Sequence, residues 1–232
     1  MNGDKLSRYF DLVKQHPHLF VNDNGANALQ VILDEAECRV QQALLWEKAR
    51  KNNEPEYWYD IGVLAEDKWV FVLRDLVRFP NGKIGGYIRI LNRASQVVCD
   101  GKDVVILPLY NQKVLLLHHF RHDDRRWHWE APRGFGEKTI SPEDNARKEM
   151  SEETGLSISR LVRLNRPSGS WEEPIVYFFA ETHGVIQGDA GEGIEGYRLI
   201  PVEDLDNVVT AGDIDDFFTC KAILLARMQK LL

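Results

Sequence analysis

Two segments of the chain, 104–109 and 114–117, are almost continuously apolar, and this places the strictest limit on its fold. Their sequences are VVILPL and VLLL, and the intervening Asn111-Gln112 is a turn signal. A strand that alternates apolar and polar residues can leave one face in water, whereas a continuous apolar run indicates a strand covered on both faces. We therefore expect these two strands in the interior of the fold, with other elements packed on both sides.

A second pair of strands is predicted ahead of them. Segments 69–73 and 86–90 alternate with a period of two and flank Asn81-Gly82, which is the strongest short-range signal for a β-hairpin. Further strands are expected at about 161–164 and 175–180, and a final helix at about 215–231.

The first 60 residues are predicted to be mostly helical. Leu6, Phe10 and Val13 recur at helical spacing before Pro17, and Asp34 with Glu37 resembles a capping box that opens a second helix through about Lys51. We interpret this region as a packing or dimerisation appendage.

Charge and cysteine content narrow the class of protein. The chain has 29 Lys and Arg against 36 Asp and Glu, a net charge of −7, so it lacks the basic surface that binds nucleic acid or acidic membranes. If its substrate is a polyanion, a bound cation is the simplest way to attract it.

The three cysteines form no CxxC pair, which argues against disulfides or structural zinc. The start of the chain lacks the apolar run of a secretory signal, so we expect a cytoplasmic protein.

One predicted helix carries a cluster of acidic residues. Ser141 followed by Pro142 is a strong helix start, and Gly155 provides a left-handed stop. Between them, Glu149, Glu152 and Glu153 stand at positions i, i+3 and i+4, which share a helix face and repel one another. A magnesium or manganese ion would relieve that repulsion, because hard cations prefer oxygen ligands. The alternative is a solvated acidic face.

The stretch from Gly134 to Leu156 resembles the Nudix box, whose pattern is Gly, five residues, Glu, seven residues, then Arg-Glu-aliphatic-x-Glu-Glu-x-Gly-aliphatic. The end of the stretch, KEMSEETGL, is in register with Gly134. Two positions depart from the pattern, since Ile140 replaces the first Glu and Lys148 replaces the Arg, a change that keeps the charge but loses the planar fork. The resemblance implies Mg²⁺ or Mn²⁺ as cofactor.

The flanking sequence is similar to the ADP-ribose pyrophosphatase branch of that family. The similar part is strand 115–121 followed by Glu-Ala-Pro-Arg-Gly. The resemblance implies that Arg121 and Glu130 lie at the substrate phosphates. It also implies that the backbone carbonyl of Arg133 ligates metal together with the box glutamates. For the general base, the resemblance implies a glutamate on loop 188–195, Glu192 first and Glu195 second, with Glu152 near the metal. Segment 167–173 resembles a further marker of the branch.

The 69–90 hairpin also looks like the N-terminal dimerisation sheet of that branch. It implies a homodimer in which Trp69 and Arg74 contact substrate, and an uncovered hairpin edge supports pairing between subunits.

Taken together, these features predict an α/β/α sandwich of the Nudix type with a mixed sheet, an α/β (α+β) fold. The expected parts are a helical appendage over 1–62, a hairpin sheet over 63–100 and a Nudix domain over 101–232, with the box at 134–156. The expected activity is hydrolysis of a diphosphate bridge, most readily in ADP-ribose, to give AMP and ribose 5-phosphate. The alternatives are a non-catalytic Nudix fold that senses a ligand, or an enzyme for other nucleotide sugars or nucleoside triphosphates. Neither nucleic acid nor membrane is an expected partner.

Overall fold

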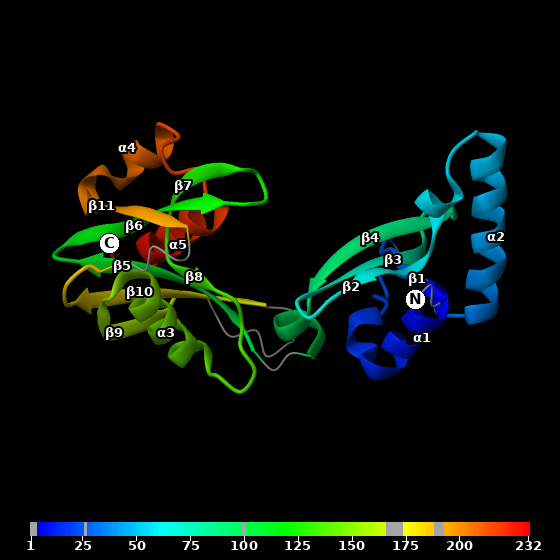
Figure 1. The fold of residues 1–232 in the computed structure, drawn as a ribbon, viewed down its shortest axis with the longest axis horizontal. Coiled ribbons are helices and arrows are strands. Elements are labelled where there is room, and N and C mark those ends of the chain that lie inside the picture. Colours follow the sequence, from blue (N-terminus) through cyan, green and yellow to red (C-terminus); the bar gives the residue numbers. More distant parts are fainter. Residues whose placement is uncertain (1–3, 26, 99–100, 166–173, 188–192) are drawn as a thin grey trace. The chain divides into compact units, whose positions relative to one another are not determined.

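The computed structural model describes residues 4–25, 27–98, 101–165, 174–187 and 193–232. It divides into two compact units, Met1–Val98 and Cys99–Leu232, which we describe separately (Figure 1). Among the described residues, none of the helices is both long and apolar enough to cross a membrane.

The N-terminal unit is a small antiparallel sheet packed against helices. Its elements are α1 (Lys5–Gln15), the short 3₁₀ helix η1 (Pro17–Phe20), β1 (Gln30–Val31), α2 (Glu35–Lys51), η2 (Glu56–Tyr59), β2 (Gly62–Glu66), β3 (Val70–Arg78), β4 (Ile84–Asn92) and the π-helical turn η3 (Arg93–Val98). The predicted hairpin is confirmed as β3 and β4, which pair from Val70 with Asn92 to Arg78 with Ile84. Gly82 adopts a φ of 82° in the turn, a backbone conformation that glycine tolerates best.

Helix α2 begins and helix α1 ends where the sequence predicts. The Asp34 side chain accepts a hydrogen bond from the Glu37 amide at 2.7 Å, and α1 ends at Gln15, ahead of Pro17. Tyr9 on α1 donates a 2.6 Å hydrogen bond to Asp75, a buried carboxylate on β3 that also binds Arg89 of β4. The predicted appendage and the hairpin therefore share one core.

The C-terminal unit contains a seven-stranded mixed sheet. Its elements are β5 (Asp103–Tyr110), β6 (Lys113–Arg121), β7 (Arg126–Glu130), β8 (Arg133–Gly134), α3 (Pro142–Thr154), β9 (Ser157–Arg163), β10 (Ile175–His183), β11 (Ile194–Pro201), η5 (Val202–Asp204), α4 (Leu205–Thr210) and α5 (Phe217–Met228). The main strand order is β11-β6-β5-β10-β9, with β7 on β6 and β8 on β5. The β5–β10 pair is parallel and the other pairs are antiparallel.

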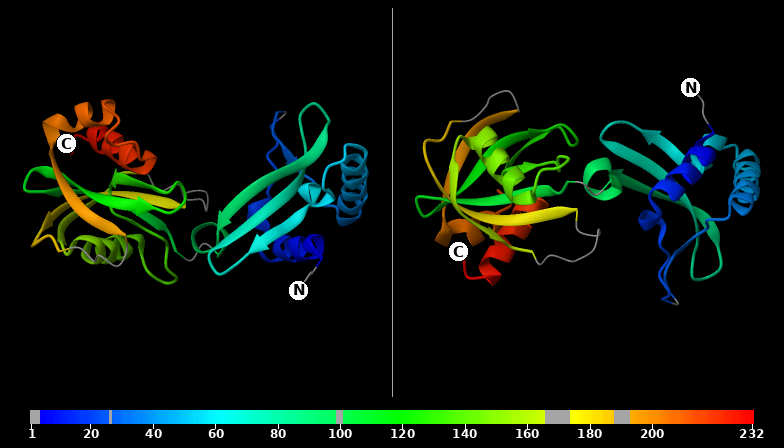
Figure 2. Two further views of the ribbon diagram at one scale, coloured as in Figure 1. Left: turned by 45° about the horizontal axis from the view of Figure 1, so that its top comes forward. Right: turned by 90° about the horizontal axis from the view of Figure 1, so that it is seen from below.

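Helices cover both faces of this sheet, with α3 on one face and α5 on the other (Figure 2). Successive residues of β5 alternate between them: Val104 and Ile106 pack with Met150 of α3, whereas Val105 and Leu107 pack with the cluster that includes α5. The predicted α/β/α sandwich is confirmed, and the apolar runs of β5 and β6 are explained by burial on both faces.

Candidate active site

Helix α3 is bounded by the residues that the sequence indicates. The Ser141 side chain accepts a hydrogen bond from the Asp144 amide at 3.1 Å, Pro142 is the first helical residue, and Gly155 caps the helix with a φ of 70°. Because hydroxyl caps and left-handed glycines fix helix ends locally, the position of every glutamate between them is set by its distance along the chain.

The three box glutamates do not share one environment. Glu153 is buried at 2% exposure, Glu149 is half-buried and Glu152 is exposed. Positions i and i+4 differ by about 40° around a helix, whereas adjacent residues differ by about 100°. Glu149 and Glu153 therefore lie in one row, and Glu152 turns aside, with its carboxylate 3.4 Å from Lys148 Nζ.

Both carboxylates of that row lie against strand β8. The backbone amide of Arg133 donates to Glu153 Oε2 at 3.2 Å. Gly134 faces Glu149 so closely that an added Cβ would lie 2.5 Å from Glu149 Cγ and nearer still to its Cδ and Oε1. Glycine at position 134 thus makes room for the Glu149 carboxylate.

This arrangement fits a divalent cation. Two carboxylates and the neighbouring backbone of Arg133 are hard oxygen donors of the type that magnesium and manganese prefer. Across the described part of the chain, three or more His, Cys, Asp or Glu side chains do not gather as a metal site, so a cation held by Glu149 and Glu153 would need a backbone oxygen as well.

Next to this row lies a buried ion cluster around Glu130, which is 1% exposed. Its two oxygens accept from the Arg121 guanidinium, His119 Nδ1 lies 3.0 Å away, and Arg133 donates at 3.2 Å. Burial is the largest influence and would raise the pKa of Glu130, but hydrogen bonds from His119 and Arg121, with the charge of Arg133, outweigh it and lower the pKa. Glu130 is therefore an ionised anchor that fixes the guanidinium of Arg121.

One of the two departures from the box, Lys148, has a carboxylate partner outside the box pattern. Lys148 donates a hydrogen bond to Glu137 of the loop that precedes α3, and this bond raises the pKa of Lys148. The box pattern alone does not reveal this pair, because it assigns no carboxylate to position 137.

Of the two candidate bases, Glu195 lies among the described residues and Glu192 lies outside them. Glu195 stands at a β-bulge of β11 and its carboxylate is 2.6 Å from His118 Nδ1. His118 is stacked between Trp127 and Trp129, with ring centroids 4.9 and 4.4 Å away. His118 thus contacts Glu195 and both indole rings. The 167–173 marker also lies outside the described residues.

The predicted substrate contacts Trp69 and Arg74 belong to the N-terminal unit. Trp69 is 57% exposed, and Lys68 Nζ lies 4.6 Å from its ring centroid. Arg74 donates to the Asp60 carbonyl at 2.9 Å and lies against Gly86.

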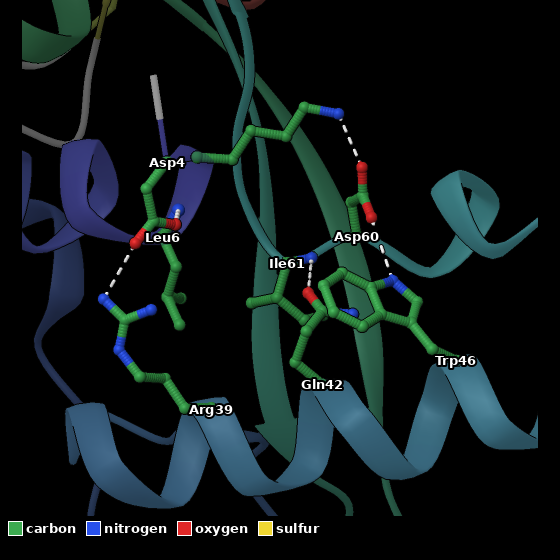
Figure 3. A pocket seen from close by; sticks show the side chains of 8 residues that line it. Asp4, Leu6, Arg39, Gln42, Trp46, Asp60 and Ile61 are labelled. Carbon is green, nitrogen blue, oxygen red and sulfur yellow. Dashed lines mark hydrogen bonds and ion pairs between the residues drawn. The ribbon is translucent and has the colours of Figure 1, made fainter. Parts of the chain in front are cut away.

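A cavity of about 430 Å³ in the same unit lies between α1 and α2 (Figure 3). The charged residues that line this cavity form salt bridges with one another, Lys5 with Asp60 at 2.5 Å and Arg39 with Asp4 at 2.9 Å. None of the predicted site residues lines this cavity.

A smaller cavity of about 310 Å³ in the C-terminal unit does include predicted residues, with Arg121, Glu130 and Arg133 in its lining. At its edge, His128 of β7 bridges Asp124 at 2.8 Å and Asp215 at 2.9 Å. The hydrogen bond to Asp215, helped by the one to Asp124, raises the pKa of His128 against the opposing effect of burial.

The site also includes residues that the sequence reasoning missed. Thr219 and Asp216, at the start of α5, contact Ala131 and Arg133. Asp216 and Thr219 have the spacing of a helix N-cap, a signal that marks a helix start without indicating what the helix end touches.

Carboxylates on a capped helix, a glycine that admits one of them and a buried arginine–carboxylate cluster together make up the candidate site. A model of the NUDIX domain matches residues 101–217, half of the chain, and the chain belongs to the Nudix hydrolase family.

The chain is similar to an ADP-ribose pyrophosphatase of Bacillus subtilis (strain 168), at 26% identity over 164 residues that cover 67% of this chain and 84% of that protein. The crystal structure of an ADP compounds hydrolase is similar in fold, with a TM-score of 0.58 and 17% identity, covering 73% of this chain and 91% of that one. The family relationship confirms the predicted Nudix fold and enzyme class.

The close approach at Gly134 gives a direct prediction. Gly134→Ala will displace the Glu149 carboxylate and weaken binding of Mn²⁺, measured by titration calorimetry, by at least about tenfold, the lower end of the effect of disturbing a ligand's support. Gly85→Ala is the matched control, because its added Cβ meets only Phe79, at an ordinary 3.6 Å. Equal Mn²⁺ affinity in both variants would contradict the assignment of Glu149.

The His128 bridge gives a second prediction. Because its pKa is raised in the folded state, protonated His128 contributes stability that is complete below the ordinary value of 6.5 and is lost as pH rises through the folded pKa. The difference in free energy of unfolding between wild type and His128→Gln, from urea denaturation, should therefore shrink from pH 6 towards alkaline pH. In an Asp215→Asn background the difference should vary less with pH. A difference that grows with pH would be the opposite of the expected linkage.

Proposed function

We propose that this enzyme hydrolyses the diphosphate bridge of a nucleoside diphosphate linked to another moiety, with ADP-ribose as the first candidate. The observation that carries the proposal is the row of Glu149 and Glu153 against Arg133 and Gly134, within the segment that matches the Nudix domain. Similarity to an ADP-ribose pyrophosphatase supports the choice of ADP-ribose.

In the proposed reaction, the oxygen of water forms a bond to one phosphorus and the bond from that phosphorus to the bridging oxygen breaks. The bridging oxygen leaves with the second phosphate, so ADP-ribose gives AMP and ribose 5-phosphate. The proton of the attacking water passes to a carboxylate.

The proposed cofactor is Mg²⁺, with Mn²⁺ as a substitute. Glu149, Glu153 and the Arg133 carbonyl would hold it, with Glu152 at the periphery. When bound, such a cation neutralises phosphate charge and activates water. Since the protein carries a net charge of −7, a cation is also the simplest attraction for an anionic substrate.

The proposed base is Glu192 or Glu195. For Glu195, the 2.6 Å contact with His118 supports a defined orientation, since the imidazole is itself held between two indoles. The base and the metal ligands would come from different elements, β11 or the loop before it and α3.

Arg121 is the proposed phosphate contact, oriented by Glu130. A bidentate carboxylate partner fixes the plane of a guanidinium and leaves its remaining N–H groups to meet an anion. Trp69 and Arg74 are proposed contacts for the nucleoside end.

We also propose a cytoplasmic homodimer that pairs through the N-terminal sheet. Ile88 and Ile90 on β4 are 49% and 67% exposed, and β4 forms a free edge of its sheet within the described residues. Apolar residues on an uncovered strand are a liability unless another surface covers them.

The activity is tested with purified protein and Mg²⁺ on ADP-ribose, other nucleotide sugars and nucleoside triphosphates. We expect turnover of ADP-ribose, and Glu149→Gln and Glu153→Gln should each lower kcat/KM by roughly 10²-fold or more, as for removal of a Lewis acid. Glu143→Gln, in the exposed first turn of the same helix, is the control that should keep the wild-type rate.

If only other members of that panel are hydrolysed, ADP-ribose is not the substrate, but the proposed hydrolysis of a diphosphate bridge still holds. The second candidate function, a non-catalytic ligand sensor, is favoured by Ile140 and Lys148 in the box. It predicts binding of nucleotides without turnover of any of them.

Dimerisation is tested by light scattering during size exclusion. We expect a mass near twice 26.7 kDa, and Ile90→Lys should shift the protein towards the monomer because it places a charge in the proposed interface. Val40→Lys, at a 60% exposed position on α2, is a matched control that should leave the mass unchanged. A fully active wild-type monomer would contradict the proposed homodimer.

A further inference from the structure

Residues 131–133, here called the connector, run from the end of β7 into the first residue of β8 and lead directly to the glycine that faces Glu149. Pro132 in the middle has a restricted φ and carries no N–H, so the connector has only two backbone donors. The Arg133 amide donates to Glu153 Oε2 of α3 at 3.2 Å, and the Pro132 carbonyl accepts from the Ile106 amide of β5 at 2.9 Å.

The remaining donor is held by the helix on the opposite face of the sheet. The Ala131 amide donates to Thr219 Oγ1 of α5 at 2.8 Å, and both groups are buried, at 1% and 0% exposure. The connector is thus attached at one end to α5, in the middle to β5 and at the other end to α3.

Thr219 is itself oriented by a neighbour. Its hydroxyl donates to Asp216 Oδ2 at 2.6 Å, which directs the proton away from Ala131 and leaves an oxygen lone pair to accept the Ala131 amide. The same carboxylate accepts the Thr219 amide at 2.7 Å as the N-cap of α5, and its other oxygen lies 3.5 Å from Arg133 Nη1. One helix end therefore contacts the connector at both Ala131 and Arg133.

We infer that Thr219 is a positioning residue for the metal site, acting through the Ala131 amide to set the position of the Arg133 carbonyl. This inference rests on the proposed function for the identity of the Arg133 carbonyl as a metal ligand. With Pro132 restricting rotation, movement of Ala131 is transmitted to Arg133 and to the hydrogen bond between its amide and Glu153. Groups that orient metal ligands typically change metal affinity or activity by roughly 10–100-fold when removed.

The experiment compares Mn²⁺ binding to the full-length wild type, Thr219→Val and Thr219→Ser by electron paramagnetic resonance of free Mn²⁺. Valine keeps the volume of threonine and removes the acceptor, whereas serine keeps the hydroxyl. We expect the Kd of Thr219→Val to rise by roughly 10–100-fold and that of Thr219→Ser to stay near the wild-type value.

Ala226→Gly separates this role from a merely structural one, because Ala226 is a buried residue in a later turn of α5 and has no side-chain hydroxyl to orient the connector. This variant should lower the melting temperature and leave the Kd for Mn²⁺ unchanged. If Thr219→Val does not fold, Thr219→Cys takes its place, because sulfur is a weak acceptor of similar size.

The outcomes separate this inference from the proposed function. Wild-type affinity for Mn²⁺ in folded Thr219→Val, or equal weakening in Ala226→Gly, overturns the role of Thr219 while leaving diphosphate hydrolysis intact. Weaker binding restored by serine supports the role even if no diphosphate is hydrolysed. If the wild type binds no Mn²⁺, the metal site and the role of Thr219 are both overturned.

Discussion

The contact between Gly134 and the carboxylate of Glu149 is the constraint on which the site depends. The contact brings a two-residue strand, β8, against the middle of α3. Only glycine fits at position 134, because any side chain there would overlap the Glu149 carboxylate. The contact requires β8 to be held on β5 and α3 to be packed on the same sheet. Pairing of Val104 with Gly134 and burial of Met150 and Ala146 against β5 meet those two conditions.

Elements far apart in the chain build the site because each supplies a different kind of restraint. The α3 helix supplies charge, β5 and β8 supply the backbone position, and α5 supplies a buried hydroxyl more than 80 residues after the group that it binds. A buried amide without a partner costs about 1–3 kcal/mol, so Thr219 removes a penalty and also fixes a direction. The ion cluster at Glu130 is fixed in the same way, since Arg121 and Arg133 neutralise a carboxylate that is almost fully buried.

Much of the fold was predictable because its signals are local. Ser141, Pro142 and Gly155 fix the bounds of α3, and Asn81-Gly82 fixes the hairpin, through effects that extend over a few residues. Glu152 could not be assigned this way, because Lys148 draws it to the edge of the acidic face. The pairs Glu137–Lys148 and Thr219–Ala131 join residues 11 and 88 positions apart, and no periodicity encodes such contacts. The substrate likewise depends on pocket shape, which the box does not specify.

The central claim is that Glu149, Glu153 and the Arg133 carbonyl together bind one cation at the end of β8. A crystal grown with Mn²⁺ and measured at the manganese absorption edge tests this directly. The account predicts an anomalous peak with oxygen ligands from all three residues at roughly 2.0–2.4 Å, within the range for hard cations. A peak coordinated elsewhere, or one that includes neither Glu149 nor the Arg133 carbonyl, would contradict it.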